Sequence, residues 1–229
     1  MPSIADQAIP GGWTERNVVV GHHAFRLILP ADPDSLLEHL EDPQTTSVPH
    51  LADPYWAKLW PAAQHLAEAL IARPFPPGTR VLELGCGSGL AGLAALAAGL
   101  DVTFSDYVPW AVQLALENAA RNGYLSARGL AFDWRNPAEQ AWPVIIAADV
   151  TYDRTNIDPL LETLHRMLAP GGIAWLGDAG RGPVADFVRD ASAHGWSTRL
   201  LDKSGQERFM PVLGAFQLIV LERAPTANF

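Results

Sequence analysis

The chain has 229 residues, of which 48% are hydrophobic and 18% are charged, and its formal net charge is −9. This length and composition predict one globular domain with a full core and exclude a disordered chain. The acidic balance argues against broad electrostatic binding to nucleic acid, and the single cysteine excludes an internal disulfide and a cysteine metal cluster.

Residues 1–52 are predicted to form an N-terminal extension ahead of the main domain. Residues 1–15 show no periodicity, which predicts a loose leader, and they lack the basic and apolar stretches of a signal peptide. Two short β-like runs, at 18–20 and 24–29, indicate a hairpin. Apolar positions at 36, 37 and 40 follow a capping aspartate and predict a short helix.

The hairpin turn contains His22 and His23, which invite a metal-binding interpretation. Adjacent residues of a strand point to opposite faces, so the pair cannot bind one ion in regular structure. We therefore expect a turn and no metal site. The longest apolar run, at 90–100, is too short to cross a bilayer, so we expect a cytoplasmic protein without membrane contact.

Residues 59–70 have helical apolar spacing, and the helix is expected to begin near Trp60 because Pro61 suits a first turn. Tyr55 and Trp56 lie just ahead of it. Aromatic residues in such a place pack into a core more often than they border a ligand, and for Trp60 both roles stay open.

The most informative stretch is 80–106. A short apolar strand at 81–84 leads into Gly85, Gly87 and Gly89, and an Ala/Leu-rich helix at 90–98 follows. A second strand then ends at Asp106. A strand, glycine turn, helix, strand and acid in this order are typical of a nucleoside-binding crevice at the carboxyl ends of parallel strands.

The glycine spacing is G-x-G-x-G rather than the G-x-G-x-x-G of dinucleotide sites, and Glu83 precedes it. A carboxylate there would repel a pyrophosphate and attract an ammonium group, so S-adenosylmethionine fits better. The segment from Glu83 through Gly85, Cys86, Gly87, Ser88 and Gly89 resembles motif I of class I methyltransferases. Asp106 resembles the motif II acid that holds the ribose hydroxyls, and Tyr107 follows it.

Two later strands end in further candidate site residues. Asp133 and Trp134 follow the third strand, at 127–132. Asp133 would accept a hydrogen bond from the adenine amino group, and Trp134 would stack on the adenine ring. A helix-cap acid and a core tryptophan are the alternative. Asp149 and Tyr152 follow the fourth strand, at 144–148, and match the Asp-x-x-Tyr signature of protein methyltransferases in this family. The resemblance implies that these two residues are catalytic and that Asp149 also borders the cofactor.

The rest of the chain completes the expected fold. A helix at 157–168 is broken by Pro-Gly-Gly, a fifth strand follows at 173–177, and a helix at 183–193 precedes two last strands. The resemblance implies an α/β, three-layer Rossmann-like methyltransferase fold. Its mostly parallel seven-stranded sheet would carry an antiparallel C-terminal edge hairpin. Residues 53–229 would form this domain.

Residues 55–61, Tyr-Trp-Ala-Lys-Leu-Trp-Pro, resemble the branch that includes the electron-transfer-flavoprotein-β lysine methyltransferases. The resemblance implies methyl transfer to a protein lysine, which needs no nucleophilic side chain, so Cys86 is expected only to pack. A small-molecule N-methyltransferase, a non-catalytic cofactor-binding partner subunit and a nicotinamide oxidoreductase stay open. The acidic net charge argues against a nucleic-acid substrate. The sequence indicates neither the target protein nor the oligomeric state.

Overall fold

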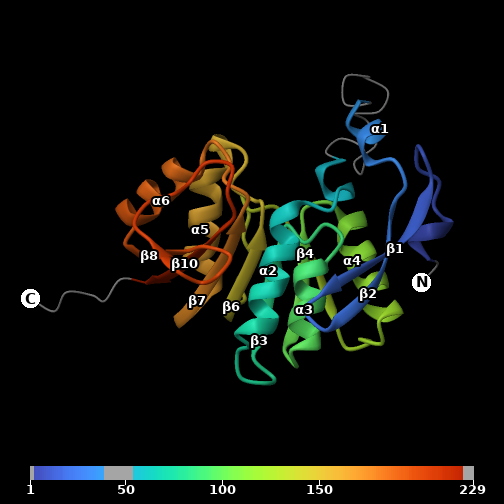
Figure 1. The fold of residues 1–229 in the computed structure, drawn as a ribbon, viewed down its shortest axis with the longest axis horizontal. Helices are drawn as coiled ribbons and strands as arrows, with labels where there is room; N and C mark the ends of the chain where they lie inside the picture. Colours follow the sequence, from blue (N-terminus) through green and yellow to red (C-terminus); the bar gives the residue numbers. More distant parts are fainter. Residues whose placement is uncertain (1–2, 39–53, 224–229) are drawn as a thin grey trace, which may run out of the picture.

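The computed structural model describes residues 3–38 and 54–223, and a mixed sheet runs through its centre (Figure 1). Within the described residues this sheet has eight strands rather than the predicted seven, because the two-residue β9 pairs with the outer edge of β8. The strand order is β5-β4-β3-β6-β7-β10-β8-β9. Neighbours from β5 to β7 pair in parallel, whereas β10 lies antiparallel between β7 and β8. The strands are β3 (Arg80–Leu84), β4 (Asp101–Asp106), β5 (Arg128–Ala131), β6 (Trp142–Ala148), β7 (Leu168–Asp178), β8 (Trp196–Leu201), β9 (Glu207–Arg208) and β10 (Gln217–Arg223).

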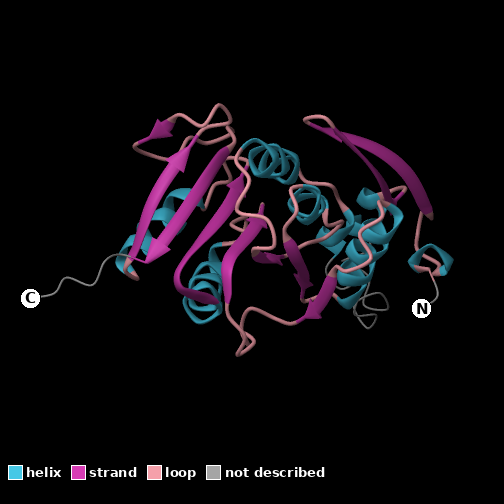
Figure 2. Ribbon diagram, turned by 90° about the horizontal axis from the view of Figure 1, so that it is seen from below, coloured by secondary structure: helices cyan, strands magenta, loops and turns pink. Residues whose placement is uncertain are grey.

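Helices cover both faces of the sheet, which gives three layers (Figure 2). The central strands β3 and β6 are apolar on both faces, so Val81 packs into one core cluster while its neighbour Leu82 packs into the other. The first cluster lies against α2 (Pro61–Ala72), α3 (Leu90–Ala97) and α4 (Pro109–Arg121). The second lies against α5 (Ile157–Met167) and α6 (Val184–Ala193).

Residues 3–15 are built into the fold, so the prediction of a loose leader is wrong for them. A 3-10 turn, η1 (Ile4–Asp6), precedes an antiparallel hairpin of β1 (Trp13–Val20) and β2 (His23–Pro30), and α1 (Pro33–Glu38) follows. The hairpin buries Val18 and Leu27 in the same cluster as α2 and α3. The periodicity of the sequence gives no sign of η1, because side chains distant in the sequence hold this turn in place.

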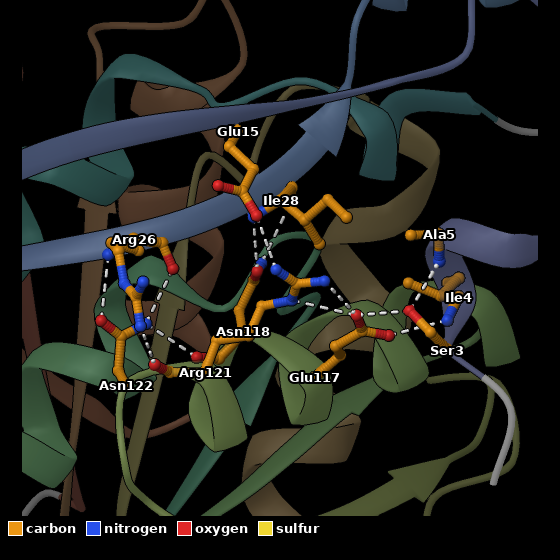
Figure 3. Close-up of polar contacts among 10 residues, drawn as sticks. All are labelled: Ser3, Ile4, Ala5, Glu15, Arg26, Ile28, Glu117, Asn118, Arg121 and Asn122. Carbon is orange, nitrogen blue, oxygen red and sulfur yellow. Dashed lines mark hydrogen bonds and ion pairs between the residues drawn. The ribbon is translucent and has the colours of Figure 1, made fainter.

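Helix α4 supplies those side chains (Figure 3). Glu117 accepts hydrogen bonds from the Ser3 hydroxyl at 2.6 Å and from the Ile4 N–H at 2.7 Å, which fix η1. Arg121 bridges Glu117 and Glu15 of β1. The contacts of α4 with Ser3, Ile4 and Glu15 join segments more than a hundred residues apart, so local sequence patterns carry no sign of them.

The other predicted elements occur with shifted ends. Helix α2 begins at Pro61 with Trp60 as its N-cap, as predicted. Strand β7 begins at Leu168, directly after α5, so the Pro-Gly-Gly stretch lies inside the strand and not before it. A register irregularity between Trp142 and Val144 of β6 accommodates these residues. Position 40 of the predicted short helix falls outside the described residues. Within the described ranges, no helix has the length and apolar character to cross a membrane.

Candidate functional site

A cleft opens at the carboxyl ends of β3, β4, β5 and β6, where the loops that follow these strands converge. A second 3-10 turn, η3 (Pro54–Ala57), and the start of α2 border it on the N-terminal side. Ligands of open α/β sheets bind at this edge. The cleft is lined by Tyr55, Trp56, Lys58, Leu59, Trp60, Ala63, Gly85, Cys86, Gly87, Ser88, Asp106, Tyr107, Val108, Asp133, Trp134, Arg135, Ala148, Asp149, Val150, Tyr152 and Asn156.

The glycines of the β3–α3 turn have separate roles. All three have positive φ, with values of 62°, 48° and 80° at Gly85, Gly87 and Gly89. A Cβ at Gly87 would lie 3.1 Å from the carbonyl oxygen of Trp56, so this glycine lets η3 approach the cleft. A Cβ at Gly89 would lie 2.8 Å from Cβ of Ala115, so this glycine serves packing against α4 and does not line the cleft.

Three N–H groups of this turn are already bonded within the protein. The Cys86 N–H donates to the Ser105 carbonyl at 2.9 Å and the Gly89 N–H to the Cys86 carbonyl at 2.7 Å. The Gly87 N–H donates to Oδ2 of Asp106 at 3.1 Å. A pyrophosphate-binding turn offers such groups to its ligand instead. The bonding argues against a dinucleotide site, as the glycine spacing does.

Glu83 lies beneath the turn, outside the cleft wall, so its position does not support the predicted contact with an ammonium group. Its side chain points toward α3, on the same side of β3 as Val81, and Oε2 accepts a hydrogen bond from the Gly92 N–H at 3.0 Å. Burial raises the pKa of Glu83 to about 8; the Gly92 bond opposes this rise and the Asp106 charge adds to it. The carboxyl group therefore caps the first turn of α3.

Asp106 sits at the end of β4 and borders the cleft beside Tyr107. The Asp106 side chain is buried, and Oδ1 accepts a hydrogen bond from the Val108 N–H at 3.0 Å. Together with the Gly87 bond, this contact fixes the carboxylate between the glycine turn and the start of α4. A fixed acid at the second strand end is the geometry expected of a ribose-binding residue.

Asp133 and Trp134 lie on the loop after β5, and both line the cleft. Oδ1 of Asp133 accepts a hydrogen bond from the Arg135 N–H at 2.9 Å, which closes a tight local turn. The Trp134 carbonyl accepts a hydrogen bond from the Thr163 hydroxyl at 2.8 Å, which ties the loop to α5. An aromatic ring and an acid are thus presented together at one end of the cleft.

Asp149 follows β6 in a strained conformation, with φ at 54°. Its side chain is buried, and Oδ2 accepts a hydrogen bond from the Ala62 N–H in the first turn of α2 at 3.2 Å. Oδ1 accepts from the Ala179 N–H at 3.2 Å and from Nε of Arg181 at 3.1 Å. Asp149 therefore joins the ends of β6 and β7 to the start of α2.

Three aromatic side chains surround the same part of the cleft. The ring centres of Tyr55 and Tyr152 are 5.5 Å apart, and those of Tyr55 and Trp60 are 6.1 Å apart. The indole N–H of Trp60 donates to the Tyr55 carbonyl at 2.8 Å, which fixes the ring. This aromatic group, Tyr55, Trp60 and Tyr152, lines the same cleft as Asp149.

Cys86 borders the cleft without an activated thiol. Burial raises its pKa well above the ordinary value, and the charges of Asp106 and Glu83 raise it further. A thiol that stays protonated is a poor nucleophile. The structure therefore agrees with the packing role predicted for Cys86.

The family model described as lysine methyltransferase matches residues 55–176, which is more than half of the chain. The chain belongs to this family. The match covers most of η3, the glycine turn, the ends of β4, β5 and β6, and most of β7. It therefore includes every segment that lines the cleft.

Curated relatives agree with this family assignment. The electron transfer flavoprotein beta subunit lysine methyltransferase of Danio rerio is 32% identical over 62% of this chain and 56% of its own length. EEF1A lysine methyltransferase 3 of Mus musculus is 29% identical over 52% of this chain and 54% of its own length. A ribosomal protein L11 methyltransferase of Xanthomonas campestris is 36% identical over 49% of this chain and 36% of its own length. The chain spans about half the length of the lysine methyltransferases it matches.

Solved structures confirm the predicted fold. A TehB-like SAM-dependent methyltransferase from Corynebacterium glutamicum superposes with a TM-score of 0.57 at 21% identity, and covers 83% of this chain and 99% of its own. The glycopeptide N-methyltransferase MtfA, in complex with S-adenosyl-L-methionine, superposes with a TM-score of 0.57 at 15% identity over 69% of this chain and 92% of its own. The mostly parallel sheet with a reversed strand near its C-terminal edge is therefore the methyltransferase fold.

Most of the predicted site residues meet in the cleft, whereas Glu83 and Gly89 lie behind its wall. Sequence reasoning missed Gly92 and Arg181. Arg181 follows β7 at the sheet edge that carries Asp149, so the strand-end argument, applied to β7, would have indicated it. The predicted residues that line the cleft are Trp60, Gly85, Cys86, Gly87, Ser88, Asp106, Tyr107, Asp133, Trp134, Asp149 and Tyr152.

Proposed function

We propose that this protein transfers a methyl group from S-adenosylmethionine to a lysine amine of another protein. One observation carries the proposal: a single cleft joins the Asp106 end, suited to a nucleoside, to the Asp149 end, where an acid adjoins an aromatic group. The relatives named as lysine methyltransferases support the choice of acceptor.

The residues at the nucleoside end fit S-adenosylmethionine. Asp106 would hold the ribose, Asp133 would accept from the adenine amino group, and Trp134 would cover the ring. When bound, S-adenosylmethionine would supply a methyl group on a positively charged sulfur. The internally bonded glycine turn fits a nucleoside without a pyrophosphate.

The residues at the other end fit a lysine side chain. A lysine with a pKa of ~10.4 must lose a proton before its nitrogen lone pair can attack the methyl carbon. Apolar surface such as Tyr55, Trp60 and Tyr152 lowers that pKa by desolvation. Asp149 would orient the amine or accept the proton that the amine loses. The new N–C bond forms as the C–S bond breaks, the electron pair goes to sulfur, and the methylated amine carries the positive charge.

An exposed apolar loop supports a macromolecular acceptor. Phe209, Met210 and Leu213, in the loop between β9 and β10, expose 105%, 69% and 67% of their surface. The loop reaches the cleft side of the sheet, because the Gly214 N–H donates to the Gly180 carbonyl at 2.9 Å, one residue before Arg181. Apolar surface of this kind is typical of protein contact sites.

The test uses purified protein, cell extract and S-adenosylmethionine with a radioactive methyl group. After the reaction, one portion is treated with nuclease, one with protease, and one is passed through a small-molecule filter. We expect label on a protein band that survives nuclease and is lost with protease. Label in the filtrate alone would instead indicate a small-molecule N-methyltransferase, and label lost with nuclease would indicate a nucleic-acid substrate.

A further inference from the structure

Arg181 contacts two residues that line the cleft, Trp60 and Asp149. Its guanidinium carbon is 4.9 Å from the ring centre of Trp60, and its Nε is 3.1 Å from Oδ1 of Asp149. The Asp149 side chain is 2% exposed, whereas that of Arg181 is 31% exposed. The contact therefore pairs a buried carboxylate with a cation that water can reach.

The buried side chain of Asp178 fixes the turn that carries Arg181. Oδ1 of the fully buried Asp178 accepts hydrogen bonds from the N–H groups of Gly180 at 2.6 Å and Arg181 at 2.9 Å. The Asp178 carboxylate is also bonded to the Thr151 hydroxyl and to Nε2 of Gln217. The backbone is thus held at the end of β7, whereas the long Arg181 side chain is 31% exposed to water.

An aromatic face beside a carboxylate is a general binding arrangement for an organic cation. A lysine side chain reaches the enzyme mainly as an ammonium ion, because its pKa is ~10.4. This ammonium ion would make the same two contacts that Arg181 makes, a cation–π contact with Trp60 and an ion pair with Asp149. We propose that Arg181 occupies the subsite for the acceptor's ammonium group in the ligand-free protein, and that the incoming lysine displaces it.

Lys58 is a second cation near this ring, but its contacts differ. Its Nζ is 5.5 Å from the Trp60 ring centre and forms an ion pair with Asp34 at 2.9 Å, away from Asp149. Arg181 alone of the two contacts both the ring and the acid. Displacement would lower the apparent affinity for any amine by the fraction of molecules in which Arg181 fills the subsite.

The inference rests on the proposed function, and its test measures amine binding apart from methyl transfer. The probe is n-butylammonium, which matches the end of a lysine side chain, titrated by ligand-observed NMR in the presence of S-adenosylhomocysteine. Arg181→Gln removes the resident cation, and Arg181→Lys keeps one. Arg135→Gln is the matched control, because Arg135 borders the cleft that Trp60 and Asp149 line, and it carries the same charge as Arg181 but pairs with Asp133.

We expect Arg181→Gln to bind n-butylammonium about three- to tenfold more tightly than the unaltered protein, a gain set by the cation–π and ion-pair contacts released. Arg181→Lys and Arg135→Gln should stay within about twofold of the unaltered protein. Added guanidinium ion should compete with the probe in Arg181→Gln.

Equal or weaker probe binding in Arg181→Gln would overturn the inference, as would equal tightening in Arg135→Gln, which would indicate a general charge effect. Calorimetry of S-adenosylhomocysteine on the same samples separates this result from a failure of the proposed function. If the unaltered protein does not bind S-adenosylhomocysteine, the proposed function is rejected. If it does bind, and Arg181→Gln has the same affinity for n-butylammonium as the unaltered protein, only the role of Arg181 is rejected.

Discussion

Asp106 is the side chain on which the proposed cofactor site depends most. Its two carboxylate oxygens accept hydrogen bonds from the N–H groups of Gly87 and Val108. Asp106→Asn replaces one acceptor with an NH₂ donor, which would face an N–H group. We predict that this change weakens S-adenosylhomocysteine binding by about 10- to 100-fold in calorimetry. Asp101→Asn, at the partly exposed start of β4, should leave the affinity unchanged; equal losses in both variants would contradict the assignment.

Gly92 is the residue that gives Glu83 room to cap α3. A Cβ at this position would lie 2.3 Å from the Phe104 ring and 2.5 Å from Oε2 of Glu83. We predict that Gly92→Ala lowers the free energy of unfolding by about 1–3 kcal/mol in urea denaturation. Gly182→Ala is the control, because no atom lies within 4 Å of the added methyl group. A Gly92→Ala protein as stable as this control would show that the packing around Phe104 is loose.

The raised pKa of Glu83 predicts a pH dependence of stability. Burial raises the pKa of Glu83 from 4.5 to about 8, so the folded protein keeps a proton that the unfolded chain releases between these values. The stabilisation of the folded state by this bound proton is complete below pH ~4.5. It is lost as the pH rises toward ~8, and the free energy of unfolding falls by up to ~1.4 kcal/mol per pH unit.

Glu83→Gln resembles the protonated acid and removes this titration. Its unfolding free energy should fall less than that of the unaltered protein between pH 5 and pH 8, measured by urea denaturation at several pH values. Parallel pH profiles for the two proteins would mean that Glu83 is ionised in the fold.

Helix α4 acts on β2 as a neighbouring strand would. Asn118 accepts from the Ile28 N–H at 2.7 Å and donates to the Ile28 carbonyl at 3.2 Å. One turn later, Asn122 makes the same pair of contacts with Arg26, at 2.9 and 2.8 Å (Figure 3). The two side-chain amides therefore bond the edge of β2 that β1 leaves open, which protects it from pairing with another chain.

The two asparagines differ in burial, and this difference gives a prediction. Asn118 is fully buried and also donates to the Ser88 carbonyl at 3.0 Å, whereas the contacts of Asn122 with Arg26 are exposed. Asn118→Ala leaves buried groups unpaired and should lower the free energy of unfolding by about 2–4 kcal/mol. Asn122→Ala should cost about 1 kcal/mol or less. Calorimetric or urea unfolding of both variants is the measurement; equal losses would show that burial does not decide the cost.

For the molecule as a whole, short sequence patterns predicted the features that depend on neighbouring residues in the chain. The glycine spacing, the apolar strands and the acids at strand ends located the central sheet and most of the cleft, because parallel strands end at one edge. The N-terminal turn, held by Glu117, depends on contacts across the fold that no short pattern encodes. The burial of Glu83 could not be predicted for the same reason. Whether its side chain points toward α3 or into the cleft depends on how the fold packs around it.

The central claim is methyl transfer to a protein lysine, and peptide mass spectrometry tests it most directly. Cell extract is treated with the purified protein and S-adenosylmethionine that carries a deuterated methyl group, with Asp106→Asn as the matched variant. The account predicts deuterated methyl groups on lysine side chains with the unaltered protein and a strong reduction with the variant. Deuterated methyl groups confined to small molecules, or found on residues other than lysine, would contradict it.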